Sequence, residues 1–98
     1  MDIKEIIVRI GYFRNRANLS AKALSYAIGK NHAYINKMEH GEYEPSMSVI
    51  LDIIEACGTT PEEFFYEDIS SYQLDKETLS IIKRLSADKK IALKELLK

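Results

Sequence analysis

Two short helical segments stand only three residues apart in the middle of the chain. The first is predicted to span residues 20–28, with Ser20 as its N-cap and Gly29 ending it. The second is predicted to span residues 32–40, with Asn31 as its N-cap. Because only Gly29, Lys30 and Asn31 connect them, the two helices are expected to meet at a steep angle. This pair is the strongest constraint on what the chain can fold into.

The rest of the chain also has helical patterns. Apolar residues recur at intervals of three and four over residues 3–16, and again after Ser46 over residues 47–57. The inward stripe of the second of these segments is predicted to contain Met47, Ile50, Leu51, Ile54 and Cys57. Thr60-Pro61-Glu62-Glu63 is a helix start signal with a capping box. No segment reads as a strand, so the predicted fold class is all-α.

The chain is predicted to divide into a domain over residues 1–66 and a C-terminal helical extension over residues 67–98. Residues 67–71 read as a linker, and two further helices are expected on either side of residues 86–88. Their apolar residues could pack on the first domain or pair with a second copy, and a homodimer through this extension is the expectation. Those residues are Leu79, Ile82, Leu85, Ile91, Leu96 and Leu97.

Charge is distributed unevenly along the sequence. The formal net charge is −1. Residues 1–43 carry seven Lys or Arg against four Asp or Glu, a net +3, whereas residues 44–98 carry seven against eleven, a net −4. An anionic ligand such as DNA is therefore expected to contact the first half.

Metal binding and catalysis are not expected. His32 and His40 are eight residues apart and have no third ligand at a recognised spacing. Cys57 is the only cysteine and falls in an apolar stripe, which favours a core position over a nucleophile. No nucleophile triad or Gly-rich phosphate loop occurs. The predictions are therefore a protein that is not an enzyme, with no cofactor and no metal.

The expected location is the cytoplasm. A lone cysteine cannot form an internal disulfide, which favours a reducing compartment. The charged start, Met1 to Glu5, does not suit a signal peptide, and Ile6-Ile7-Val8 is too short an apolar run to span a membrane.

Residues 6–65 resemble the Xre/Cro-like, or lambda-repressor-like, helix-turn-helix family. The residues that carry the resemblance are Leu19-Ser20, Leu24, Ile28-Gly29, Ile35, Met38-Glu39, Gly41, Pro45-Ser46 and the segment Gly58 to Phe65. The resemblance implies a five-helix lambda-repressor-like domain, followed here by two C-terminal helices. It also implies double-stranded DNA as the partner, with the helix over residues 32–40 lying in the major groove.

The resemblance further implies roles for individual residues. His32, Ala33, Asn36 and Lys37 would face base edges, where Asn suits adenine, Lys suits guanine and Ala suits the thymine methyl group. Arg14 and Glu39 would form a structural ion pair. The residues that would contact phosphates are Arg16, Lys22, Lys30, Asn31, Tyr34, His40 and Tyr43.

Two positions depart from the family pattern. Ala21 stands at the start of the second helix, where the family often has a Gln that contacts the DNA backbone, and its side chain can donate nothing. Ser25 replaces a small residue inside that helix, so its hydroxyl must be buried or hydrogen-bonded.

Two functions remain open from sequence alone. One is a sequence-specific, repressor-like transcriptional regulator. The other is a protein-interaction module of the antitoxin or anti-repressor type, which would use the same fold and bind a protein partner through the C-terminal helices. Asn36 and Lys37 could also lie on an ordinary solvated face. The DNA-binding function would be favoured over the protein-interaction function if one surface held Arg16, Lys22, Lys30 and Lys37 together with His32 and Asn36.

Overall fold

The computed structural model describes residues 1–98, and all of its regular elements are helical, which confirms the all-α prediction. Helix α1 (Ile3–Arg16) has the bounds that the sequence predicts. Asp2 caps it by accepting a hydrogen bond from the backbone N–H of Glu5 at 2.9 Å. The chain then turns at Asn18, whose φ of 57° is left-handed. Asn tolerates this conformation better than most residues, which suits it to the end of α1.

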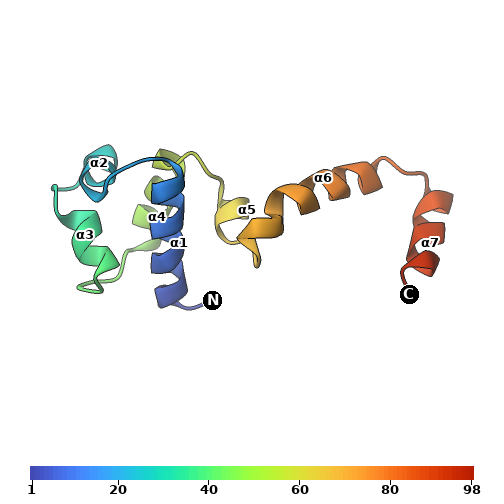
Figure 1. Ribbon diagram of the computed structural model, residues 1–98, viewed down its shortest axis with the longest axis horizontal. Coiled ribbons are helices and arrows are strands. Elements are labelled where there is room, and N and C mark those ends of the chain that lie inside the picture. The colour runs from blue at the N-terminus through green and yellow to red at the C-terminus, as the bar shows by residue number, and fades with distance from the viewer. The chain divides into compact units, whose positions relative to one another are not determined.

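Four more helices complete the first compact unit, Met1–Phe65. Ser20, Ser46 and Thr60 each accept a hydrogen bond from the backbone N–H three residues on, so each caps the helix that follows it. The predicted caps at Ser20 and Thr60 are confirmed. The helices, labelled in Figure 1, are α2 (Ala21–Ala27), α3 (Tyr34–Glu39), α4 (Met47–Ala56) and α5 (Pro61–Phe64).

All five helices contribute side chains to the core of this unit. Phe13 of α1 and Phe64 of α5 are fully buried, with their ring centroids 5.4 Å apart. Burying an apolar side chain of this size stabilises a fold by roughly 1.5–3 kcal/mol. The other fully buried apolar residues are Ile10, Leu24, Ile35, Met38 and Ile53. Because this set includes residues of α2 and α3, the core holds both helices in place.

The inward stripe of α4 differs from the prediction at two positions. Met47 is 58% exposed and Leu51 is 45% exposed, so placing them inward was wrong. The buried residues of α4 are Val49, Ile50, Ile53 and Ile54. Two overlapping stripes on this helix share Ile50 and Ile54, and either has the spacing of a helix face. The stripe that contains Ile53 is the buried one.

The second unit, Tyr66–Lys98, consists of a short 3-10 turn η1 (Ile69–Ser71) and helices α6 (Tyr72–Lys83) and α7 (Ala87–Leu96). The turn lies in the segment that the sequence predicts to be a linker. It is held by the Asp68 carboxylate, which accepts hydrogen bonds from the backbone N–H and the hydroxyl of Ser70. The two predicted C-terminal helices are confirmed.

Helices α6 and α7 bury few apolar side chains. Tyr72 is 5% exposed, and its ring meets that of Tyr66 with centroids 5.1 Å apart. At least half of the side-chain surface is exposed at Leu74, Leu79, Ile81, Ile91, Leu96 and Leu97. No helix of the structure has the length and apolar character that a membrane crossing requires.

Candidate nucleic-acid interface

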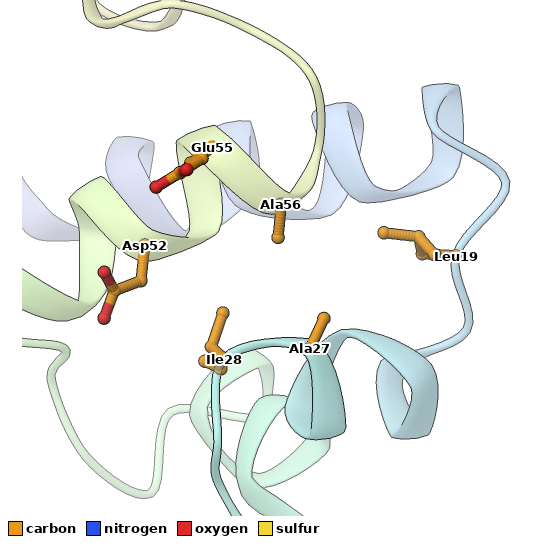
Figure 2. Close-up of a pocket in the computed structure, with 6 residues that line it drawn as sticks. All are labelled: Leu19, Ala27, Ile28, Asp52, Glu55 and Ala56. Carbon is orange, nitrogen blue, oxygen red and sulfur yellow. The ribbon is translucent and has the colours of Figure 1, made fainter.

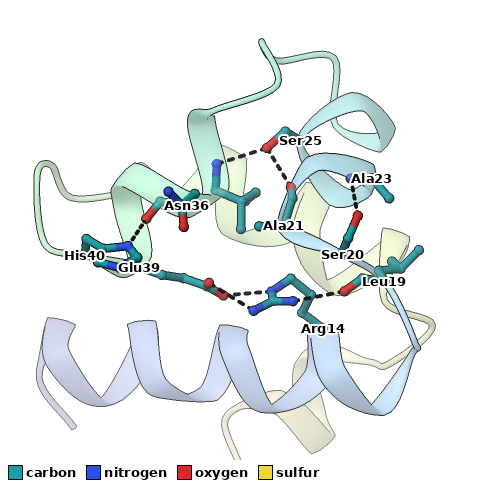
Figure 3. Close-up of polar contacts among 10 residues, drawn as sticks. Arg14, Leu19, Ser20, Ala21, Ala23, Ser25, Asn36, Glu39 and His40 are labelled. Atoms are coloured by element: carbon teal, nitrogen blue, oxygen red, sulfur yellow. Dashed lines mark hydrogen bonds and ion pairs between the residues drawn. The ribbon is translucent and has the colours of Figure 1, made fainter.

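Ser25 connects α2 to the N-terminus of α3. Its side chain is fully buried, and its Oγ donates to the Ala21 carbonyl at 2.8 Å while accepting from the Ile35 backbone N–H at 3.0 Å. Figure 3 shows both bonds. The N–H groups in the first turn of a helix have no partner within their own helix. Ser25 therefore caps α3 from a neighbouring helix, a role that sequence periodicity does not reveal.

The start of α3 lies two residues later than predicted. Asn31 Oδ1 accepts from the Ala33 N–H, two residues on, at 3.0 Å, but a turn and not a helix follows directly. This bond makes an Asx-type turn. His32 and Ala33 form the turn, and the helix begins at Tyr34 with Ala33 as an N-cap that makes no side-chain bond. The predicted helix over residues 32–40 is thus a turn followed by Tyr34–Glu39.

The buried and exposed faces of α3 are clearly separated. Ile35 and Met38 are fully buried, whereas Asn36 and Lys37 between them are exposed. His32, in the preceding turn, is exposed, and Ala33 is half-buried. The amide of Asn36 and the amine of Lys37 form no side-chain hydrogen bond or ion pair within the protein. Both side chains are therefore available to a ligand at this face.

Tyr34, Tyr43 and Lys30 form a cluster beside the start of α3. The two rings meet with centroids 5.0 Å apart, and the Tyr43 hydroxyl donates to the Tyr34 backbone carbonyl. The Lys30 Nζ lies 5.3 Å from the centre of the Tyr34 ring. Burial raises the pKa of both tyrosines above its ordinary value of 10.0. The Tyr34 hydroxyl has no partner, whereas Tyr43 uses its proton inside the protein.

Other predicted phosphate contacts differ in what they can donate. Lys22, in the first turn of α2, is exposed and has no acidic partner. Asn31 is exposed, and its amide NH₂ stays available because only the oxygen holds the turn. His40 is exposed, and its Nδ1 lies 2.6 Å from the Asn36 carbonyl oxygen, which can only accept. Its Nε2 can therefore donate to a phosphate only when the ring is doubly protonated.

Arg16 is engaged away from α3. Its guanidinium donates to both carboxylate oxygens of Glu63, at 2.9 and 2.8 Å, and lies 4.6 Å from the centre of the Phe13 ring. The hydrogen bonds to Glu63 raise the pKa of Arg16 above its ordinary value. Arg16 thus connects α1 with α5.

Arg14 and Glu39 connect α1 with the end of α3. The Arg14 Nε donates to Oε1 of Glu39 at 2.9 Å, and a second guanidinium nitrogen donates to Oε2 at 3.1 Å. A third bond reaches the Leu19 carbonyl at 3.0 Å (Figure 3). Both side chains are only 17% exposed. This two-pronged geometry is the strongest form of such a pair, so α3 is fixed at its end as well as at its start.

A groove of about 510 Å³ lies between α2 and α4 and contains no residue of α3. Its apolar lining is Leu19, Ala27, Ile28 and Ala56, and Asp52 and Glu55 of α4 add two carboxylates (Figure 2). The negative charge of these carboxylates disfavours phosphate binding there. No group of three or more potential metal ligands occurs in the structure.

Comparison with known proteins identifies the domain. A family model described as helix-turn-helix matches residues 10–64, which spans α2, α3 and the helices that pack around them. Searches among curated proteins and among solved structures gave no significant match. The match covers more than half of the chain, and it includes every element that positions α3. The chain therefore belongs to the Xre or lambda-repressor-like helix-turn-helix family of DNA-binding regulators.

Proposed function

We propose that this protein is a sequence-specific transcriptional regulator of the repressor type, with α3 as its recognition helix in the major groove. One observation carries the proposal. Helix α3 is fastened at its start by Ser25 and at its end by Arg14, while Asn36 and Lys37 on its outer face have no partner in the protein. A rigid helix with unpaired amide and amine groups suits base-edge recognition.

Base contacts are proposed for two residues in the turn before α3 and two exposed residues within it. Asn36 could bind adenine through two hydrogen bonds, and Lys37 could donate to guanine acceptors. His32 lies in the turn just before α3, and half-buried Ala33 would contribute through its small size beside a thymine methyl group.

Phosphate contacts are proposed for a ring of exposed donors around α3. Lys22, Lys30 and Asn31 have unpaired donor groups, and the Tyr34 hydroxyl adds a neutral one. His40 would contribute when doubly protonated. Tyr43 would act indirectly, by holding the backbone of Tyr34. Such contacts position a protein on the duplex and carry no base information.

We further propose that the protein binds DNA as a homodimer. Symmetric dimers place two recognition helices about 34 Å apart, so that both meet successive turns of the major groove on one face of the duplex. The exposed apolar residues of α6 and α7 supply an unsatisfied surface for such pairing. A palindromic operator is the expected consequence.

The test is selection of bound DNA from a pool of random duplexes, followed by sequencing. Wild-type protein should enrich one motif, ideally palindromic. The Asn36→Ala, Lys37→Ala double variant should keep its circular dichroism spectrum and lose that enrichment, because both side chains are exposed and support no fold contact. A matched control is Lys4→Ala, Asn15→Ala, which also removes one lysine and one amide from exposed positions on α1.

Each outcome decides between the candidate functions. Salt-sensitive binding without a motif would leave a nonspecific DNA-binding protein and would contradict the proposed specificity. Absence of binding even at low salt would favour the second candidate, a protein-interaction module of the antitoxin or anti-repressor type. The observation that favours this second candidate is the exposed apolar surface of the C-terminal helices. Equal loss of the motif in the control variant would contradict the assignment of recognition to α3.

A further inference from the structure

One face of α6 has the spacing of a coiled-coil seam. Leu74, Thr78, Ile81 and Leu85 follow one another at intervals of four, three and four residues, the heptad pattern of a pairing helix. Leu74 is 67% exposed and Ile81 is 55% exposed. Leu85 stands two residues past the end of the helix, at a hydrogen-bonded turn to Ile82. Leu74 and Ile81 are thus exposed apolar residues on this face, whereas Leu79, which is 50% exposed, lies off it. Exposed apolar residues on one helix face indicate a surface that is covered in the functional state.

Two opposite charges flank this seam on the same side. Glu77 precedes Thr78, and Arg84 precedes Leu85, so both occupy the position just before a seam residue, seven residues apart. Arg84 forms no ion pair in the structure. The Glu77 carboxylate accepts only a neutral hydrogen bond, from the Gln73 amide at 3.1 Å. Neither charge is therefore satisfied by an opposite charge within the protein.

We propose that α6 pairs in antiparallel orientation with α6 of a second copy of this chain. In this pairing Leu74 packs against Leu85 of the second copy, and Thr78 packs against Ile81 of the second copy. The flanking positions then meet their equivalents across the seam, which places Glu77 beside Arg84 of the second copy twice, once on each side of the two-fold axis.

Charge complementarity selects both the occupant and the orientation. A parallel pair would bring Glu77 beside Ile82, five residues on, and would leave both charges unpaired. A foreign partner would need its own Arg and Glu at this spacing, whereas a second copy has them by symmetry. This inference deepens the proposed function and rests on it, because paired chains would present two copies of α3 to one duplex.

The test is charge reversal in the full-length chain, with sedimentation equilibrium as the measurement. Wild type should dimerise, and Glu77→Arg or Arg84→Glu alone should weaken dimerisation by roughly tenfold or more, since two symmetric pairs become repulsive. An equimolar mixture of the two single variants should dimerise again, because each Arg then faces a Glu of the other variant. The double variant should also recover.

The control is Ser80→Arg, a charge added to an exposed position off the seam, which should leave dimerisation unchanged. A monomeric wild type, or single variants that dimerise as well as wild type, would overturn the proposal. Failure of the mixture to recover would overturn the antiparallel orientation. Circular dichroism confirms that each variant keeps its helices. Binding to a half-site duplex is measured in parallel. If a monomeric protein still binds this duplex, the pairing has failed but the proposed DNA-binding function has not.

Discussion

The polar side chains that position α3 bond mainly to backbone atoms. Ser25 binds the Ile35 N–H, Tyr43 binds the Tyr34 carbonyl, and Arg14 binds the Leu19 carbonyl in addition to Glu39. Every residue has a backbone N–H or carbonyl, whatever its side chain, so the sequence does not show which backbone group a polar side chain will bind. The Arg14–Glu39 pair could be proposed only because the family resemblance implied it. The double role of Ser25 depends on a residue ten positions away and could be found only in the folded chain.

Removing the Ser25 hydroxyl should destabilise the domain. In Ser25→Ala the buried Ile35 N–H loses its acceptor, which costs about 1–3 kcal/mol of unfolding free energy. Urea denaturation measures the change. Ser48→Ala is the control, because Ser48 is exposed on α4 and should change stability by less than about 0.5 kcal/mol. Equal stability of the two variants would show that the bond contributes nothing.

Neutralising Glu39 should have a similar cost. Glu39→Gln removes the charge that receives two hydrogen bonds from Arg14, and the partly buried guanidinium is left without a counter-charge. We expect a loss of roughly 1.5–3 kcal/mol, the range for hydrogen bonds to charged groups. Glu95→Gln, which breaks the exposed pair with Lys98, should have no measurable effect in the same denaturation experiment. A silent Glu39→Gln variant would contradict the structural role assigned to this pair.

Stability should fall at alkaline pH. Burial raises the pKa of Cys57 in the folded state, although Arg14 and Arg16 oppose part of the rise, and burial also raises the pKa of Tyr34 and Tyr43. The unfolded chain releases these protons first, from an ordinary pKa of 9.0 for Cys and 10.0 for Tyr. Stability is therefore complete below pH 9 and declines as pH rises above it.

The measurement is urea denaturation at neutral pH and at about pH 10. Cys57→Ala should reduce the difference between the two conditions without abolishing it, since the tyrosines still contribute. A wild-type stability that rises with pH above 9 would contradict the sign of these shifts.

At the level of helices, the sequence predicted where helices begin more accurately than which side of a helix is buried. The caps of α2, α4 and α5 follow from local chemistry, since each uses a side chain three residues from its N–H partner. The start of α3 was misplaced because the bond from the Ala33 N–H to Asn31 closes a turn over His32 and Ala33, and the helix begins only after it. The face of α4 was misplaced because two apolar stripes compete on one helix, and the neighbouring core selects between them.

Substitutions on α4 should distinguish its two stripes. Ile53→Ala, in the fully buried stripe, should cost about 2–5 kcal/mol. Leu51→Ala should cost much less, because Leu51 is 45% exposed. Thermal or urea unfolding of both variants checks the expectation. Comparable losses would show that Leu51 is buried in solution after all.

Over the whole molecule, the uneven charge matters more than the net charge of −1. The basic residues around α3 are few, and the Arg16 guanidinium is paired with Glu63. Three exposed lysines remain there, Lys22, Lys30 and Lys37. Affinity for duplex DNA should accordingly fall with salt at a logarithmic slope of roughly −3 per chain, about −0.9 for each neutralised phosphate.

Lys22→Ala should reduce that slope by about one and weaken all sequences alike, because a phosphate contact carries no base information. Lys89→Ala, which removes an exposed lysine of α7, should leave the slope unchanged. Fluorescence anisotropy over a series of salt concentrations measures both. Identical slopes for wild type and Lys22→Ala would exclude Lys22 from the interface.

The central claim is that α3 contacts bases in the major groove. The most direct measurement is affinity for the selected operator after each purine in turn is replaced by its 7-deaza analogue, which removes the major-groove N7 acceptor and keeps base pairing and the minor groove intact. If α3 contacts the bases, affinity should fall about tenfold or more at one cluster of positions per half-site, and the losses there should be smaller for Asn36→Ala, Lys37→Ala. Undiminished affinity at every replaced purine would contradict readout by this helix.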